Sequence, residues 1–181
     1  MGTLSDFNLT RMIADFGSRF LVETGTGSGK DAEFAADFAF EQVYSIEESQ
    51  KRAIKVAFHN ARRRNLTVLH SRNERGLKDV LNEIPIDAPV IYWLDSHPSP
   101  HDLECDLRLI ATLRNIARDI FLIDDLRTYE AGDYDDGPAS IDEMVPPARR
   151  NLAFVDEILG QTHLVNRLSQ RTGYLCAFPQ S

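Results

Sequence analysis

The chain has 181 residues, of which 43% are hydrophobic, and a formal net charge of −8. This length can bury one sizeable core but hardly two, so we expect a single domain over residues 1–181. Charged residues interrupt the first nineteen positions, which disfavours a signal peptide or a membrane span there, and two distant cysteines without metal-ligand spacing favour reduced thiols in the cytoplasm.

The first predicted strand, residues 20–24, runs directly into three glycines. From Glu23 onwards the sequence reads acid-x-Gly-x-Gly-x-Gly. The three glycines are Gly25, Gly27 and Gly29. A strand that ends in spaced glycines lets the backbone approach a ligand closely at the start of the next helix, which is predicted over 30–40. The segment therefore indicates a nucleotide-type pocket.

Two common nucleotide motifs do not fit this segment. A P-loop requires glycine five positions before Gly29, where Thr24 stands, and Asp31 replaces the hydroxyl residue that would bind Mg²⁺. A dinucleotide fingerprint requires a third glycine where Lys30 stands. Both the phosphate-loop reading and the NAD reading are therefore weakened.

The second predicted strand, residues 43–46, ends in Glu47, about twenty residues beyond the glycines. An acid at the tip of this strand can accept hydrogen bonds from both hydroxyls of a ribose. Glu47 is therefore the predicted ribose ligand. The alternative is that Glu48 and Ser49 simply cap the next helix.

The helix that begins after Ser49 carries both apolar and basic residues. We predict an inward face at helical spacing, formed by Ala53, Ile54, Ala57, Phe58 and Ala61. Its basic residues indicate a solvated helix face rather than a nucleic-acid groove. In contrast, residues 124–143 contain eight acids and one arginine, which would repel a phosphate backbone. Nucleic acid is therefore not expected as a partner.

The rest of the chain continues to alternate strand and helix patterns. Further strands are predicted at 66–69, 89–95, 120–123, 162–168 and 174–178, with helical patterns at 103–111 and 151–159. These elements predict an α/β fold: a doubly wound, Rossmann-like, mostly parallel seven-stranded sheet with a C-terminal antiparallel hairpin.

Acidic residues lie at the carboxyl ends of four of these strands. They are Glu23, Glu47, Asp95, Asp124 and Asp125. Ligands of such sheets bind outside the carboxyl ends of the strands, so these side chains should gather along one edge. Uncompensated carboxylates at close range repel one another and would not all stay ionised. We therefore expect a cationic ligand among them, and hard oxygen donors suit Mg²⁺ or a similar divalent cation.

The acid-glycine motif resembles the first motif of class I S-adenosylmethionine-dependent methyltransferases, whose last strand is also antiparallel. The resemblance implies that the turn formed by Thr24 and the three glycines packs against the methionine part of S-adenosylmethionine, and that Glu23 reaches its amino group. After the third strand, the Gly-Asp or Gly-Asn usual in that superfamily is absent. Ser71 and Asn73 are the remaining candidates for the adenine contact.

A second resemblance concerns the segments Leu94-Asp95-Ser96-His97 and Ile123-Asp124-Asp125. They are similar to the metal site of the divalent-cation-dependent sugar O-methyltransferases and of the related cephalosporin hydroxylase-like proteins. This similarity implies that Asp95, Asp124 and Asp125 bind a metal, and that Asp95 or His97 is the catalytic base. The alternative is that these aspartates cap loops.

Together these patterns predict an O-methyltransferase that uses S-adenosylmethionine and a divalent metal and acts on a sugar or another small hydroxylated metabolite. The alternatives are a metal-dependent hydroxylase-like protein on the same scaffold, a cofactor-binding module without catalysis and an NAD-dependent dehydrogenase. No membrane partner is expected. A homodimer is plausible, because no long insertion covers the predicted active edge and a partner subunit could supply a lid.

Overall fold

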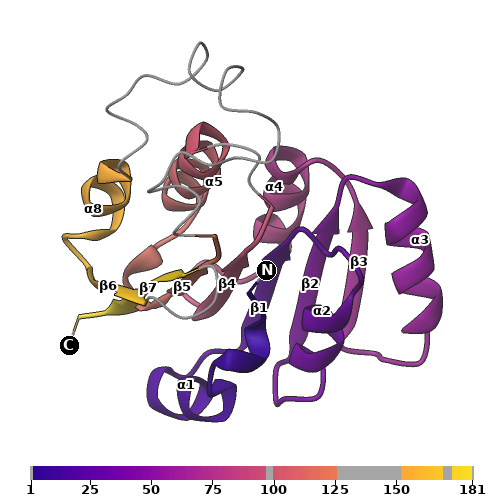
Figure 1. Cartoon of the computed structure of the whole chain (residues 1–181). Coiled ribbons are helices and arrows are strands. Elements are labelled where there is room, and N and C mark those ends of the chain that lie inside the picture. The colour runs from indigo at the N-terminus through magenta and orange to yellow at the C-terminus, as the bar shows by residue number, and fades with distance from the viewer. Residues whose placement is uncertain (1, 97–99, 126–151, 169–172, 181) are drawn as a thin grey trace.

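The computed structural model describes residues 2–96, 100–125, 152–168 and 173–180. These residues form a seven-stranded sheet with helices on both faces (Figure 1). The strand order is β3-β2-β1-β4-β5-β7-β6. The predicted doubly wound α/β fold is confirmed.

Five strands are parallel and two are antiparallel. The parallel strands are β1 (Phe20–Thr24), β2 (Gln42–Glu47), β3 (Leu66–His70), β4 (Val90–Leu94) and β5 (Ile120–Ile123). The antiparallel hairpin consists of β6 (His163–Leu168) and β7 (Tyr174–Pro179), and β7 lies between β5 and β6. All seven strands lie within one residue of their predicted bounds.

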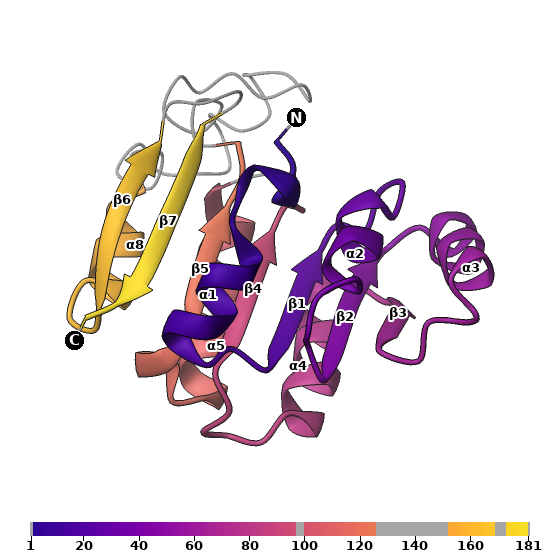
Figure 2. The same ribbon diagram turned by 90° about the horizontal axis from the view of Figure 1, so that it is seen from below.

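The helices divide between the two faces of the sheet (Figure 2). On one face lie the short 3₁₀ helix η1 (Leu4–Asp6), α1 (Leu9–Phe16) and α2 (Lys30–Ala35). On the other lie α4 (Asn73–Glu83), α5 (Pro100–Leu113) and α8 (Ala153–Leu159). A second 3₁₀ helix, η2 (Ile116–Arg118), precedes β5. No helix in the described ranges is long and apolar enough to cross a membrane.

Strand β4 shows why the sheet carries two cores. Tyr92 points to one face, where its ring stacks on Phe121 at 4.9 Å between centroids, and Trp93 points to the other, where it contacts Phe7 and Tyr174. A strand buried on both faces needs a continuous apolar run rather than an alternating one. This requirement explains the run that predicted β4.

The sequence did not predict α4, and it misplaced the face of α3 (Gln50–His59). The residues that α3 and its C-terminal end bury are Ala53, Val56 and Asn60, whereas Ile54 and Phe58 are 61% and 79% exposed. The predicted inward face is therefore correct for Ala53 and wrong for Ile54, Ala57, Phe58 and Ala61, which are all exposed. The helix carries two apolar stripes, and the contact of Val56 with the glycine turn decides which stripe is buried.

Candidate cofactor and metal site

The glycine turn after β1 has a different requirement at each glycine. All three have left-handed backbone, with φ of 86° at Gly25, 53° at Gly27 and 86° at Gly29. A Cβ at Gly25 would lie 2.7 Å from the carbonyl oxygen of Asp95, and one at Gly29 would lie 2.6 Å from Val56. At Gly27 the nearest atom would be 3.9 Å away. Gly25 and Gly29 therefore permit close packing of the chain, whereas Gly27 faces open space where a ligand could approach.

Glu23 lies beneath this turn and is almost completely buried. The pKa of its carboxyl group is raised to about 8, chiefly by burial; a hydrogen bond from Ser45 opposes this shift, and the charges of Asp31 and Glu47 add to it. Glu23 is therefore largely neutral at pH 7, and an ammonium group beside it would favour its ionised form. The buried Thr24 hydroxyl next to it has no hydrogen-bond partner among the described residues.

Glu47, at the tip of β2, uses both carboxylate oxygens. One oxygen accepts a hydrogen bond from the backbone N–H of Gly27 at 2.9 Å, and the other accepts one from Ser49 N–H at 2.8 Å. Arg52 lies 3.8 Å away. The same acid therefore joins the glycine turn to the start of α3. Because a carboxylate has about four lone-pair positions, Glu47 can still accept hydrogen bonds from ribose hydroxyls.

Asp95, Asp124 and Asp125 converge as the strand topology predicts. They follow the neighbouring strands β4 and β5, and one possible ligand atom from each lies within 4.8 Å of the others. Burial raises the pKa of Asp95 to about 9, and the charges of Asp124 and Asp125 are the next largest causes. Such a group of hard oxygen donors suits Mg²⁺, whose charge would remove the repulsion between them.

Asp125 also has an unusual backbone conformation. Its φ of 62° lies in the left-handed region, which is uncommon for a residue with a side chain. Such a conformation costs on the order of 1–3 kcal/mol, and residues of this kind cluster at functional sites. The geometry is therefore consistent with a site at the end of β5.

The N-terminal segment covers part of this acidic edge, which the sequence did not predict. Gly2 N–H donates a hydrogen bond to Asp124 at 2.7 Å, and Thr3 N–H donates one to the hydroxyl of Tyr174 at 3.1 Å. Asp31 accepts hydrogen bonds from the Thr3 hydroxyl and Leu4 N–H, both at 2.8 Å. A side chain at position 2 would collide with Asp124 and Tyr174. These partners are far apart in sequence, so no local pattern indicates them.

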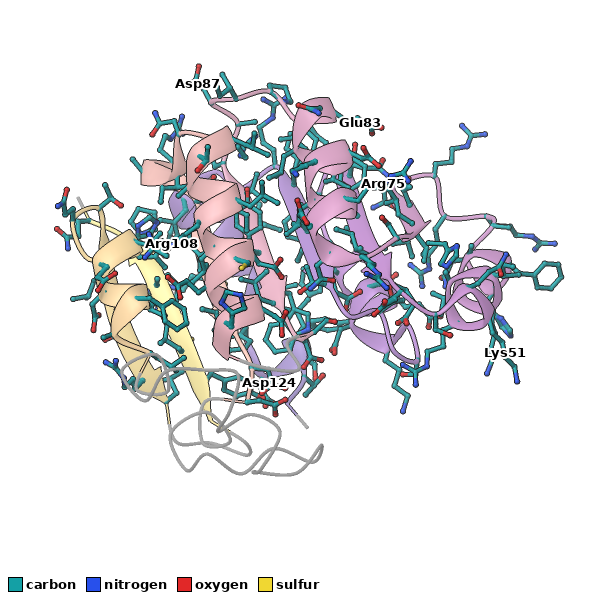
Figure 3. The ribbon with its side chains drawn as sticks, turned by 90° about the horizontal axis from the view of Figure 1, so that it is seen from above. Lys51, Arg75, Glu83, Asp87, Arg108 and Asp124 are labelled. Carbon is teal, nitrogen blue, oxygen red and sulfur yellow. The ribbon has the colours of Figure 1, made fainter. Side chains whose placement is uncertain are left out.

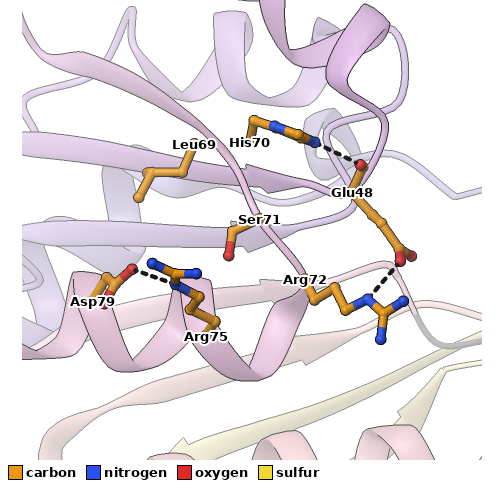
Figure 4. A pocket seen from close by; sticks show the side chains of 7 residues that line it. All are labelled: Glu48, Leu69, His70, Ser71, Arg72, Arg75 and Asp79. Carbon is orange, nitrogen blue, oxygen red and sulfur yellow. Dashed lines mark hydrogen bonds and ion pairs between the residues drawn. The ribbon is translucent and has the colours of Figure 1, made fainter.

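Of the two residues predicted to contact adenine, Ser71 directly follows β3 and Asn73 is the first residue of α4. Ser71 lines a pocket of about 540 Å³ that also includes Leu69, Arg72 and Arg75 (Figure 4). Asn73 instead donates hydrogen bonds to the Ser96 carbonyl and to Asp106, both at 2.9 Å. It therefore ties the connection after β3 to the end of β4 and to α5.

His97, the other predicted base, lies outside the described residues. Asp95 is therefore the candidate base that the structure describes. In Figure 3, Asp124 lies at the edge of the sheet opposite the connection that carries Asp87. Because Asp87 is exposed and distant from the acidic cluster, it offers a control for substitutions there.

The raised pKa of Asp95 predicts a pH-dependent difference in stability. Its pKa is 3.8 when unperturbed and about 9 in the fold without a cation. The fold therefore favours the protonated form, and this stabilising contribution is complete below pH 4 and lost as the pH rises through 9. Asp95→Asn stays neutral, so its Tm should rise relative to that of the native protein between pH 5 and pH 9.

Thermal unfolding in metal-free buffer measures this difference. Asp87→Asn is the control and should follow the native curve. Parallel curves for Asp95→Asn and the native protein would contradict the interpretation. Added Mg²⁺ should raise the Tm of the native protein more at high pH than at low pH, because deprotonated ligands bind the metal.

The order and direction of the strands define the fold class. A sheet of this order, with β7 antiparallel between β5 and β6, a glycine turn after β1 and an acid at the tip of β2, is the class I S-adenosylmethionine-dependent methyltransferase fold. The resemblance predicted from the motifs is confirmed at the level of the fold.

Solved structures of methyltransferases share this architecture. A Staphylococcus aureus protein provisionally named as a caffeoyl-CoA O-methyltransferase has a TM-score of 0.65 and 12% identity, over 99% of this chain and 85% of that chain. A methyltransferase of Podospora anserina bound to S-adenosylhomocysteine has a TM-score of 0.58 and 14% identity, over 94% and 76%. An rRNA methylase from Streptococcus thermophilus has a TM-score of 0.55 and 13% identity, over 96% and 97%. No protein-family model matches the sequence, and no curated protein matches it.

Proposed function

We propose that this protein transfers a methyl group from S-adenosylmethionine to an oxygen atom of a sugar or another small hydroxylated metabolite, with the help of a divalent cation such as Mg²⁺. The observation that carries the proposal is that two sets of residues lie at the same edge of the sheet. The first is the glycine turn with Glu23 and Glu47. The second is the cluster of Asp95, Asp124 and Asp125.

The first group suits S-adenosylmethionine. Gly27 leaves space beside the turn, Glu47 stands at the tip of β2, and the buried Glu23 would be stabilised as an anion by the amino group of the cofactor. When bound there, the cofactor supplies an activated methyl group. Glu23 and Glu47 lie on the neighbouring strands β1 and β2, so they can orient its two ends.

The second group suits a cation beside the methyl acceptor. Asp95, Asp124 and Asp125 would hold the cation, which in this class of site lowers the pKa of a coordinated hydroxyl. Without a cation, the pKa of Asp95 is about 9, so its carboxyl group is mostly protonated at pH 7 and cannot accept a proton. A positive charge beside Asp95 would restore its basic form. The same residue could then bind the metal or accept the proton of the substrate hydroxyl.

Calorimetric titration tests the cofactor half of the proposal. S-adenosylmethionine and S-adenosylhomocysteine should bind, and NAD should not. Mg²⁺ should change the binding heat that is measured on titration with an acceptor. Binding of NAD with no response to the other two ligands would overturn the proposal.

Labelled S-adenosylmethionine tests the chemistry. Methyl transfer to vicinal diols and sugars that requires Mg²⁺ is the expected result. Cofactor binding without transfer to any acceptor would favour the binding-module alternative, and metal-dependent hydroxylation without transfer would favour the hydroxylase-like one. Because one of the similar structures is an rRNA methylase, the same assay includes ribosomal RNA as an acceptor.

A further inference from the structure

The positive charge of this acidic protein is concentrated in one segment. Residues 49–80 contain nine lysine or arginine residues and two acids, a net charge of +7 within a chain of net charge −8. This segment comprises α3, β3 and most of α4, at the end of the sheet farthest from α8 (Figures 1 and 3). Within the described residues, this positive segment therefore lies at one end of the sheet.

The exposed side of α3 combines these charges with apolar side chains. Phe58 is 79% exposed and Ile54, one helical turn earlier, is 61% exposed. The Phe58 ring lies edge-on to the neighbouring ring of His59, with 6.2 Å between their centroids. In the part of the chain that the structure describes, neither hydrophobic core cluster includes a residue of α3. Core packing therefore does not account for Phe58 and Ile54.

Four cations on and after α3 form no ion pair with any residue that the structure describes. They are Lys51, Lys55, Arg62 and Arg64, and all four are exposed. None of them takes part in an ion pair within residues 2–96, 100–125, 152–168 and 173–180. Lys51, Lys55 and Phe58 follow one another at spacings of four and three residues, so they share one side of the helix.

Two further exposed arginines lie near the N-terminal end of α3, one before and one within α4. Glu48, just before α3, forms an ion pair with Arg72 at 3.1 Å, and its carbonyl oxygen contacts the His70 ring at 3.1 Å (Figure 4). Arg75 lies on the other side of the same pocket, where it pairs with Asp79 at 3.9 Å. These ion pairs are highly exposed and therefore weak, so an incoming anion can compete for both arginines.

We propose that this surface, formed by Lys51, Lys55, Phe58, Arg62, Arg72 and Arg75, binds single-stranded nucleic acid. Its unpaired cations would contact phosphates and release counterions. The exposed ring of Phe58 would stack on an unpaired base, which a double helix does not offer. The proposal concerns binding and goes beyond the proposed methyl transfer. It also revises the sequence expectation that these basic residues form only a solvated face.

A membrane is the competing partner for a basic helix with exposed apolar residues. Interfacial helices bury a broad apolar face in the lipid, and their binding strength scales with that apolar area. Here the exposed large apolar side chains of α3 are Ile54 and Phe58 alone, and the cations extend over three elements. The observations therefore favour single-stranded nucleic acid, which offers both phosphates and unpaired bases, over a membrane.

Fluorescence anisotropy with a labelled oligouridine tests the proposal on the intact chain, without cofactor, over a range of KCl concentrations. The native protein should bind the single strand more tightly than a duplex of the same length. Lys51→Glu/Lys55→Glu/Arg62→Glu should abolish binding at moderate salt and reduce the slope of log K against log salt by about two, since each cation contributes about 0.7. The matched control Arg11→Glu/Arg118→Glu/Arg167→Glu carries the same charge change on other surfaces and should bind normally.

Two substitutions of Phe58 separate stacking from lipid insertion. Phe58→Ala and Phe58→Leu should each weaken oligouridine binding by about tenfold without changing the salt slope, because neither side chain can stack. The protein should not co-sediment with phosphatidylserine vesicles. Two results would overturn the proposal. One is vesicle binding by the native protein that Phe58→Leu retains. The other is equal oligouridine affinity in the α3 triple variant and in the matched arginine control. All of these variants should bind S-adenosylhomocysteine with the affinity of the native protein in calorimetry. A failure of the nucleic-acid proposal can therefore be told apart from a failure of the proposed methyl transfer.

Discussion

Replacement of Asp124 by asparagine is expected to lower methyl transfer by at least about a hundredfold, because even the outer partners of metal ligands contribute about 10- to 100-fold. Asparagine keeps an oxygen that can accept the hydrogen bond from Gly2 N–H, so the fold should be retained. Cofactor binding should also be retained, because Asp124 follows β5 and the glycine turn follows β1, with β4 between them. The loss should therefore appear in turnover and in the response to Mg²⁺.

Two measurements decide this outcome. Calorimetry with S-adenosylhomocysteine reports on the cofactor pocket, and transfer from labelled S-adenosylmethionine over a Mg²⁺ titration reports on the metal. Asp87→Asn has the same change of side chain at a distant exposed position and should behave like the native protein. Native turnover and an unchanged Mg²⁺ response in Asp124→Asn would show that the aspartates are structural.

The glycines of the turn are expected to differ strongly when each is replaced by alanine. In Gly25→Ala the new Cβ would lie 2.7 Å from the Asp95 carbonyl oxygen and from Ser96, and φ is 86°. Strain and overpacking together should cost about 3 kcal/mol or more. In Gly27→Ala the φ of 53° is allowed for alanine and no clash arises, so the cost should be about 1 kcal/mol.

The effect of Gly27→Ala on cofactor binding should be larger than its small effect on stability suggests. Gly27→Ala should weaken S-adenosylhomocysteine binding by at least about tenfold, because a methyl group there enters the space left for the ligand. Gly17→Ala is the matched control, because Gly17 has a φ of 67° and no close neighbour but ends α1, away from the site. Urea unfolding and calorimetry on the three variants give both quantities. Native cofactor affinity in Gly27→Ala would contradict the assigned position of the pocket.

The parallel strands were predictable because each contains a short apolar run followed by a polar or acidic residue. The convergence of Asp95 with Asp124 and Asp125 was predictable for a related reason, since parallel neighbouring strands end at the same edge. The face of α3 was not predictable, because Ile54 and Val56 are both apolar and only the distant glycine turn selects between them. Local periodicity contains no information about that partner.

Helix α4 and the N-terminal cover illustrate two other kinds of failure. The first residues of α4 are polar and include Gly76, which weakens a helical pattern, yet this glycine is needed because a Cβ there would lie 2.6 Å from Ile46. The contact of Gly2 with Asp124 spans 122 residues, and nothing in the first residues indicates it. Asp31 appeared only as a residue that excludes a P-loop, but it accepts two hydrogen bonds from the N-terminal segment.

The position of β7 has a consequence for how the molecule assembles. Strand β7 is synthesised after β6 but pairs on both sides, with β5 and with β6. During translation, β6 therefore cannot join the growing sheet until residues 174–179 have emerged, and β5 has an unprotected edge until then. Pairings between strands distant in sequence form slowly, and exposed strand edges promote aggregation. Nascent chains that stop before β7 should therefore depend on chaperones more than the full chain does.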